Sequence, residues 1–455
     1  MKDKIRETLL SVFFIFGLLF YSGNCWERLY YAAPTLLPRV SPEMQTPGFW
    51  IERNFIADAY VFDETELCQF NRKIAETAGR PNFLTFPESF QGETLRKTLL
   101  GDIESFRRQS HYTTSGRITP RFYQDIVGYM SLDGLSGENK VSFGIVSGRA
   151  PQRFLPTDLP FYRTRGEVNF DLLQNNLLEI ATPVAIFHTT ADAGWFYVEG
   201  LWTRGWVKSE KVARAEKEEI NRFINREPFV VVIRPLADIY FDAQLTRKYE
   251  TAGMGVRLPV SRFYEDKVEV LLPLRLPGGD VQLTSGYLKK EDIHPGYLPY
   301  TPRTIIERAF QFLHLPYGWG GQYGFQDCSG FLQSVFATAG VFLPRDSSEQ
   351  RKIGRPIGFF DPAVGELERE KLLLEQGIAG VTLLGMPGHS LLYLGQVDGR
   401  PYVIHSLYAY SQPTWHGDVV RVVNRVVVSD LRLGTGTRKG SFLERLISAR
   451  VLDKQ

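Results

Sequence analysis

Two ten-residue segments of this chain, 81 positions apart, follow one pattern and constrain its fold more than any other feature. Residues 203–212 and 284–293 both read Thr-x-Gly-aromatic-apolar-Lys-x-Glu-x-apolar. A repeat at this distance implies two copies of one small domain. A glycine before an aromatic and an apolar residue suits a strand that leaves a tight turn and packs into a small barrel. We therefore expect small all-β barrels at 141–212 and 227–295, joined by a charged helical connector at 213–226.

Composition places the chain among ordinary globular proteins. It has 455 residues, of which 43% are hydrophobic and 23% charged, and this length suggests about three domains. The net charge is +2 and the basic residues are spread out, so no nucleic-acid partner is expected. The 41 glycines and 26 prolines favour many turns and short strands.

Residues 1–24 have the layout of a signal peptide. Lys2, Lys4 and Arg6 precede an apolar run at 9–21, which is shorter than the roughly 20 residues of a spanning helix. The alternative is a short membrane anchor that is never cleaved.

Cys25 follows directly and is the expected site of lipidation after cleavage. A lipobox usually has Leu three residues before the cysteine and Gly or Ala just before it, whereas this chain has Ser22 and Asn24. Residues 25–48 contain four prolines without a clear period and are expected to be a tether. We therefore expect an exported, membrane-anchored lipoprotein of the cell envelope, facing the periplasm or the cell wall.

The next stretch, 49–140, has a mostly helical pattern with polar breaks. Helices are expected at 64–77, 94–108 and 119–130. The chain has three cysteines, and a chain this long needs no disulfide framework. If Cys25 is acylated and Cys328 is catalytic, Cys68 is left unpaired, and we expect it to pack as a small apolar residue.

Residues 296–455 read as a last domain in which helices precede strands. Helices are expected at 302–314 and at 329–339, the second entered at Cys328 and closed by Gly340. Strands are expected at 391–394, 402–405 and 419–428. This order favours an α+β domain.

Cys328 combines a thiol with a helix start, where the macrodipole favours negative charge. A thiol at such a place, with histidines on later strands, provides the candidate nucleophile and base of a cysteine peptidase. His389 opens one strand and can act as the base, and His405 ends the next strand. Asp398-Gly399 between them is a hairpin signal, so the strands should be antiparallel neighbours with His405 orienting His389.

Five segments in order resemble those of the NlpC/P60 family of papain-like cell-wall cysteine peptidases. They are 316–321 (Pro-Tyr-Gly-Trp-Gly-Gly), 327–330 (Asp-Cys-Ser-Gly), 343–350 (Leu-Pro-Arg-Asp-Ser-Ser-Glu-Gln), 388–390 (Gly-His-Ser) and 404–406 (Ile-His-Ser). The part ahead of them is similar to members with an N-terminal stabilising segment and two bacterial Src-homology-3-like barrels. The resemblance implies a multidomain fold, in which an α+β papain-like catalytic domain follows two small all-β barrels and a mostly helical N-terminal segment.

The resemblance also implies roles for single residues. Cys328 would be the nucleophile, His389 the base and His405 the third member of a Cys-His-His triad. Tyr317 would stabilise the oxyanion together with the Cys328 backbone N–H. Asp327 would bind the free amine of an N-terminal L-alanine, and a cationic ligand there would offset the rise in thiol pKa that a neighbouring carboxylate causes.

Further candidates for substrate contact are Trp319, Ser390 and Arg149. Trp319 could equally be a packing residue. Arg149 belongs to the first-barrel stretch 147–158, which is our choice for the part of the barrel that lines the cleft. Residues 343–350 are expected to form a turn into a helix that could also wall the cleft.

The family subgroup cleaves peptidoglycan stem peptides between D-glutamate and the diamino acid. We therefore expect an endopeptidase for stem peptides with a free N-terminal L-alanine, in which the barrels block cross-linked wall. Two other functions stay open: a non-catalytic wall-binding lipoprotein, and an amidase or acyltransferase on the same scaffold.

No cofactor is expected, and no metal, because no Cys-x-x-Cys, His-x-x-x-His or His-Glu-x-x-His spacing occurs. The expected partners are stem peptides, and the membrane through Cys25. We expect a monomer.

Overall fold

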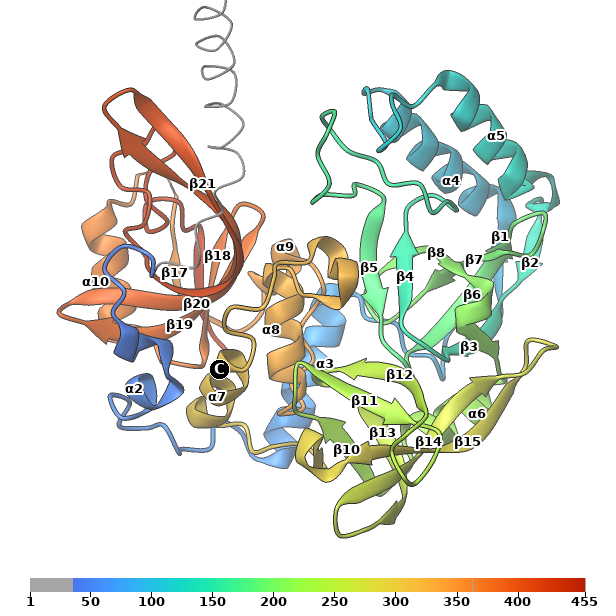
Figure 1. Cartoon of the computed structure of the whole chain (residues 1–455), viewed down its shortest axis with the longest axis horizontal. Helices are drawn as coiled ribbons and strands as arrows, with labels where there is room; N and C mark the ends of the chain where they lie inside the picture. Colours follow the sequence, from blue (N-terminus) through green and yellow to red (C-terminus); the bar gives the residue numbers. More distant parts are fainter. Residues whose placement is uncertain (1–35, 362, 455) are drawn as a thin grey trace, which may run out of the picture.

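The computed structural model describes residues 36–361 and 363–454 (Figure 1). The expected signal peptide and Cys25 lie outside these residues. Helices and antiparallel sheets form a multidomain α+β architecture, as expected. Within the two described ranges, no helix is both long enough and apolar enough to cross a membrane.

Two seven-stranded sheets form the middle of the chain. The first consists of β3 (Ser142–Val146), β4 (Ala150–Arg153), β5 (Gln174–Leu178), β6 (Pro183–Thr189), β7 (Trp195–Glu199), β8 (Arg204–Lys208) and β9 (Val212–Arg214). The second consists of β10 (Phe229–Val232), β11 (Leu236–Tyr240), β12 (Lys248–Gly253), β13 (Arg257–Phe263), β14 (Lys267–Arg275), β15 (Val281–Lys289) and β16 (Ile293–Pro295). Helix α6 (Lys217–Ile224) joins them, where the charged connector was expected.

The two sheets have the same topology. Their strand orders are β5-β4-β8-β7-β6-β3-β9 and β12-β11-β15-β14-β13-β10-β16, so each label in the second is seven higher. The repeated segments form β8 and β15, each followed by a short 3-10 helix, η3 (Ser209–Lys211) or η4 (Lys290–Asp292). A Cβ on Gly205 would lie 2.7 Å from the carbonyl oxygen of Arg153, so this glycine lets β8 approach β4 closely. Two copies of one small barrel are thereby confirmed.

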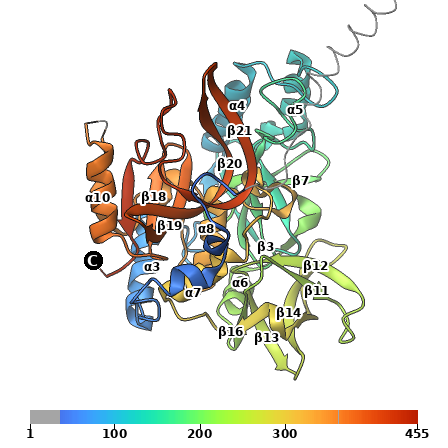
Figure 2. The ribbon, with the colours of Figure 1, turned by 60° about the vertical axis from the view of Figure 1, so that its left-hand side comes forward.

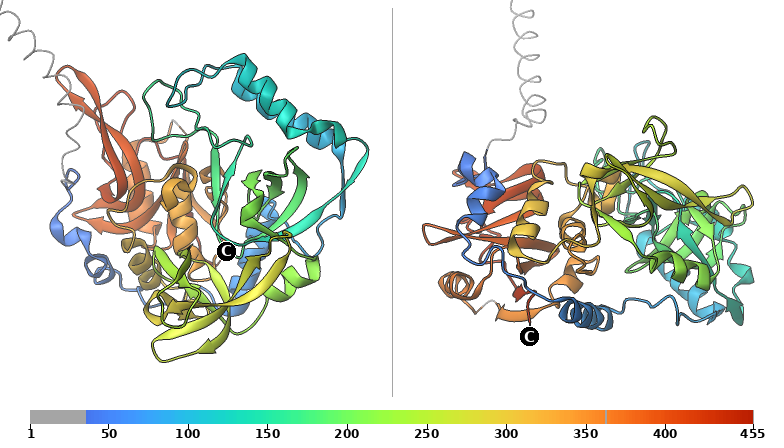
Figure 3. Two further views of the ribbon diagram at one scale, coloured as in Figure 1. Left: turned by 45° about the vertical axis from the view of Figure 1, so that its right-hand side comes forward. Right: turned by 90° about the horizontal axis from the view of Figure 1, so that it is seen from below.

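The N-terminal part divides between two neighbours. Its elements are η1 (Pro42–Gln45), α2 (Pro47–Ile51), α3 (Glu64–Ala78), β1 (Ser89–Gln91), α4 (Gly92–Arg107), α5 (Pro120–Met130), η2 (Leu132–Gly134) and β2 (Glu138–Lys140). The three longer helices are confirmed to within about two residues of the expected bounds. Leu99 of α4 and Met130 of α5 share a buried cluster with Trp206 of the first barrel, which these helices flank (Figure 3). Trp50 of α2 and Ile74 of α3 instead pack into the core of the last domain.

Two expectations for this region are wrong. Residues 36–48 are not a free tether, because Leu37, Val40 and Met44 are buried in the core of the last domain. The prolines indicated a linker, but the apolar residues between them give this stretch a folded position. Cys68 is exposed rather than packed, because the buried face of α3 carries Phe70 and Ile74, and Cys68 lies off that face.

The last domain contains a six-stranded antiparallel sheet of order β17-β22-β18-β19-β20-β21. Its elements are α7 (Pro302–Phe310), η5 (Trp319–Gly324), α8 (Cys328–Ala337), α9 (Ser347–Gln350), β17 (Arg355–Phe359), α10 (Glu366–Gln376), β18 (Thr382–Met386), β19 (His389–Val397), β20 (Arg400–Thr414), β21 (Gly417–Asp430) and β22 (Ser448–Val451). Helix α8 lies against the sheet (Figure 2), and its Phe331 and Leu332 are buried with Leu391 of β19.

The hairpin expected at Asp398-Gly399 is confirmed, with φ of +51° and +71° at its two residues. His405, however, lies within β20 rather than at its end, because β20 and β21 continue together as a long two-stranded ribbon. Helix α7 stops at Phe310, before the expected end at residue 314, and His314 has φ of +69°.

Candidate active site

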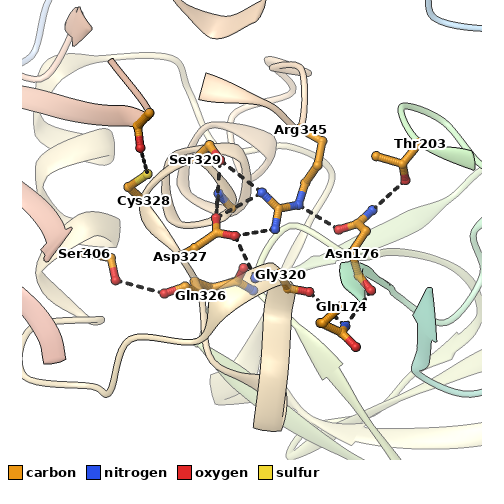
Figure 4. Close-up of polar contacts among 12 residues, drawn as sticks. Gln174, Asn176, Thr203, Gly320, Gln326, Asp327, Cys328, Ser329, Arg345 and Ser406 are labelled. Carbon is orange, nitrogen blue, oxygen red and sulfur yellow. Dashed lines mark hydrogen bonds and ion pairs between the residues drawn. The ribbon is translucent and has the colours of Figure 1, made fainter. Parts of the chain in front are cut away.

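Cys328 is the first residue of α8, and neighbouring residues stabilise this helix N-terminus (Figure 4). Asp327 is the N-cap of α8, and its Oδ1 accepts the backbone N–H of Gly330 at 2.8 Å. Its Oδ2 accepts the backbone N–H of Gly320 at 3.0 Å, which ties the glycine-rich segment to the same carboxylate. Gly320 and Gly321 have φ of +58° and +83°, a left-handed conformation that glycine adopts without steric cost. The thiol is thus held at a defined helix N-terminus.

The Cys328 side chain is buried, and its Sγ lies 4.0 Å from the carbonyl oxygen of Gly388, the residue before His389. Burial raises the pKa of Cys328 to about 12, and the Asp327 carboxylate adds to this rise. The Ser390 backbone N–H opposes it. Loss of water therefore outweighs the influence expected from the helix start. The thiol is protonated at neutral pH and needs a base when it attacks.

The two histidines are hydrogen-bonded to each other. Nε2 of His389 lies 2.7 Å from Nδ1 of His405, and Nε2 of His405 lies 3.0 Å from Oγ of Ser429 on β21. Burial, with the Arg445 cation nearby, lowers the pKa of His389 to about 4. Burial and the neighbouring His389 hold the pKa of His405 well below its usual value. Both rings are therefore neutral at pH 7, so His389 can accept a proton.

The Asp327 carboxylate already has a cation beside it. Arg345, in the turn before α9, donates from Nη1 to Oδ1 at 3.0 Å and from Nη2 to Oδ2 at 2.5 Å. Although burial opposes it, this guanidinium lowers the pKa of Asp327. Nε of Arg345 donates to Oδ1 of Asn176 on the first barrel at 2.7 Å (Figure 4). A cationic ligand was expected to offset the charge of Asp327, whereas Arg345 of the chain itself already does so.

The first barrel also contributes aromatic contacts beside the thiol. The ring of Phe170, in the loop between β4 and β5, lies 4.4 Å from that of Tyr408 on β20 and 5.3 Å from that of Trp319. It lies 6.1 Å from the ring of Tyr317. Nδ2 of Asn169 donates to the Tyr408 hydroxyl at 3.0 Å. This loop is therefore in direct contact with the segment that leads into Cys328.

Tyr317 stays a phenol, because burial raises its pKa and the neighbouring Asp327 and Cys328 add to the rise. Its hydroxyl can therefore donate a hydrogen bond. Ser390 is buried, 2% exposed, and its contribution at the thiol is its backbone N–H.

Arg149 is held by contacts within the protein. Its guanidinium is paired with Glu179, with Nη2 2.8 Å from Oε1, and also donates to the carbonyl oxygen of Gly324 at 3.4 Å. It thereby joins the first barrel to the loop before α8, and contact with a substrate stays a prediction.

The structure thus brings most of the expected site residues to one place: Cys328, His389, His405, Tyr317, Asp327, Trp319 and Ser390. Sequence reasoning missed five residues around them: Asn169, Phe170, Asn176, Arg345 and Ser429. Arg345 lies inside one of the five recognised segments, 343–350, and this was the signal that could have indicated a cation near Asp327. Across the described residues, no group of three or more His, Cys, Asp or Glu side chains could hold a metal ion.

The last domain and the first barrel are similar to parts of known proteins. The model of the NlpC/P60 family matches residues 314–406, and that of an SH3 domain (SH3b1 type) matches residues 160–208. A gamma-D-glutamyl-L-lysine dipeptidyl-peptidase of Bacillus cereus is 32% identical over 33% of this chain and 44% of that protein. One of the same name from Bacillus subtilis is 44% identical over 15% of this chain and 23% of that protein. The chain therefore spans less than half the length of these relatives.

Solved structures support the fold. An NlpC/P60 endopeptidase from Photobacterium damselae subsp. piscicida matches with a TM-score of 0.71 and 20% identity, over 87% of this chain and 94% of that one. An NlpC/P60 family protein from Bacillus cereus matches with a TM-score of 0.50 and 19% identity, over 69% of this chain and 100% of that one. At such identities the likeness concerns the fold alone.

Proposed function

We propose that this chain, whose residues 314–406 match the model of the NlpC/P60 family, is a cysteine endopeptidase for peptidoglycan stem peptides. The bond cleaved is the one between γ-D-glutamate and the diamino acid, as the names of the two Bacillus relatives suggest. The observation that carries the proposal is the 2.7 Å contact of two neutral histidines beside a buried thiol at a helix start.

The hydrogen bonds suggest how His389 works. If Nε2–H of His405 donates to Ser429, its Nδ1 is free to accept from Nε2–H of His389. Nδ1 of His389 then carries a lone pair. It takes the proton of Cys328 as Sγ bonds to the scissile carbonyl carbon, so that sulfur is never left as an unpaired buried anion. His405 orients the ring and stabilises the imidazolium that forms.

The remaining steps follow the same groups. The Cys328 backbone N–H and the Tyr317 hydroxyl donate to the carbonyl oxygen as it gains negative charge. The His389 imidazolium protonates the amine of the leaving diamino acid, the C–N bond breaks, and a thioester of the glutamyl γ-carboxyl with Cys328 remains. His389 then activates a water that hydrolyses this thioester and regenerates the thiol.

Asp327 is the proposed contact for the free amine of an N-terminal L-alanine. Because Arg345 already donates to both of its oxygens, the amine would have to share this carboxylate. Trp319 and the Phe170 loop would border the peptide on the side of the first barrel. The protein would act in the cell envelope, exported and lipidated at Cys25.

Replacement of the thiol tests the proposal. Cys328→Ala should lower turnover of L-Ala-γ-D-Glu-L-Lys and of its meso-diaminopimelate analogue by at least about 10³-fold, because no other group can form the thioester. Products are identified by liquid chromatography and mass spectrometry. Cys68→Ala is the matched control, since this exposed thiol on α3 should leave both rates unchanged. Undiminished turnover by a folded Cys328→Ala protein would end the proposal.

A further inference from the structure

A cavity lies where the modules meet. Its volume is about 730 Å³, within the range of roughly 300–1,000 Å³ typical of small-molecule sites. The N-terminal part, α6, both barrels and the last domain all contribute to its wall. Helix α8 contributes Ser334 and Ala337 from its second half, whereas Cys328, His389 and His405 do not line it. Asn176, the partner of Arg345, also lines it, so the cavity borders the candidate active site but does not include the proposed catalytic residues.

Most of the wall is apolar or aromatic, and its charges are nearly balanced. The charged lining residues are Arg80, Glu179, Lys217, Glu227 and Arg257. All but Arg80 have an opposite charge beside them: Glu179 pairs with Arg149, Glu227 with Arg257, and Lys217 with Glu88. One positive charge in the wall is thus left over.

That charge is the Arg80 guanidinium, which lies near two aromatic rings from different modules. Its Cζ is 5.4 Å from the ring centroid of Trp202 on the first barrel and 5.0 Å from that of Phe342 in the last domain. No hydrogen bond or ion pair joins this guanidinium to another side chain of residues 36–361 and 363–454. Aromatic faces hold an arginine in place without neutralising it, so its donors stay available to an anion.

We propose that this cavity binds a small organic carboxylate with an apolar body. The carboxylate accepts hydrogen bonds from Arg80, whose planar fork matches it in shape and charge. The apolar body lies against the aromatic part of the wall, to which Phe83, Phe223 and Phe229 contribute. A single leftover cation fits one carboxylate better than a multiply charged ligand.

Calorimetry with octanoate and octanamide tests this site on the whole protein. The two probes have the same alkyl chain, but only octanoate carries a charge. Octanoate should bind to the wild-type protein at least about tenfold more tightly than octanamide, because only the acid forms the ion pair with Arg80. Equal affinity for the two probes, or no binding of octanoate, would overturn the proposal.

Variants then locate the binding. Arg80→Gln should reduce octanoate to the affinity of octanamide, whereas Arg80→Lys should keep part of the preference for the acid. Arg72→Gln is the matched control, because this exposed arginine on α3 should not affect binding. Cys328→Ser should bind octanoate as the wild type does. Loss of binding in that variant would place octanoate at the active site and overturn the assignment.

Discussion

At the scale of single residues, burial sets the protonation of the proposed catalytic pair. It raises the pKa of Cys328 to about 12 and lowers that of His389 to about 4, so both groups are neutral over a wide range of pH. The proposed mechanism needs His389 neutral and Cys328 protonated before attack. A lowered histidine pKa therefore extends activity toward acid.

The pH dependence of kcat/KM follows from this direction. Activity should be level from pH 7 to about 5 and fall by half near pH 4, rather than near the ordinary histidine value of 6.5. Arg445→Gln should move this fall in kcat/KM to higher pH, because the Arg445 cation helps to lower the His389 pKa. Arg438→Gln, at an exposed position, should not move it. Circular dichroism at each pH separates titration from unfolding. A half-maximal kcat/KM near pH 6.5 in the wild type would contradict the lowered pKa of His389 as the base.

The sequence predicted Cys328 and both histidines because each stands in a short segment with a recognisable neighbour pattern. It could not predict Ser429, since a serine in a valine-rich strand has no distinguishing pattern. Its contact with His405 depends on the register of β21 against β20. Asn176 could not be predicted either, because its partner Arg345 lies in another domain and local sequence does not show how the domains meet.

At the scale of elements, the loop between β4 and β5 places an aromatic ring of the first barrel against the aromatic segment before Cys328. Phe170 contacts Tyr408 and Trp319, and Asn169 is hydrogen-bonded to Tyr408. The repeat predicted the barrel, but not this loop, because the second barrel has only a short connection at the equivalent place. A repeat pattern describes what two copies share and says nothing of an insertion in one.

Phe170→Ala should raise KM for the stem peptide about five- to tenfold and leave kcat nearly unchanged. The ring supplies contact area and aromatic pairing beside the substrate but no group that reacts. Val168→Ala is the matched control, because this residue of the same loop is 51% exposed and should affect neither constant. Steady-state kinetics give both values, and an unchanged KM for Phe170→Ala would remove the loop from the substrate site.

At the scale of the whole molecule, the first barrel is joined to the last domain by several hydrogen bonds. Gln174 donates to the Gly320 carbonyl, Asn176 accepts from Arg345, and Asn169 donates to Tyr408. These contacts connect distant parts of the chain, so composition and local pattern could indicate the domains but not how they meet. If the barrels block cross-linked wall, as the family resemblance implies, the substrate should enter by its end.

The last prediction therefore concerns the substrate's N-terminus. The tripeptide L-Ala-γ-D-Glu-meso-diaminopimelate should be cleaved about tenfold faster, in kcat/KM, than its N-acetyl derivative. Acetylation removes the charge that would reach Asp327, and a hydrogen bond to a charged group contributes roughly 1.5–3 kcal/mol. The lower end applies because Arg345 already shares this carboxylate. A C-terminal amide, which leaves the amine free, is the control and should be cleaved like the parent. Equal rates for the free and acetylated peptides would remove Asp327 and the barrel from the selection of substrate, while a loss of activity in Cys328→Ala would still stand.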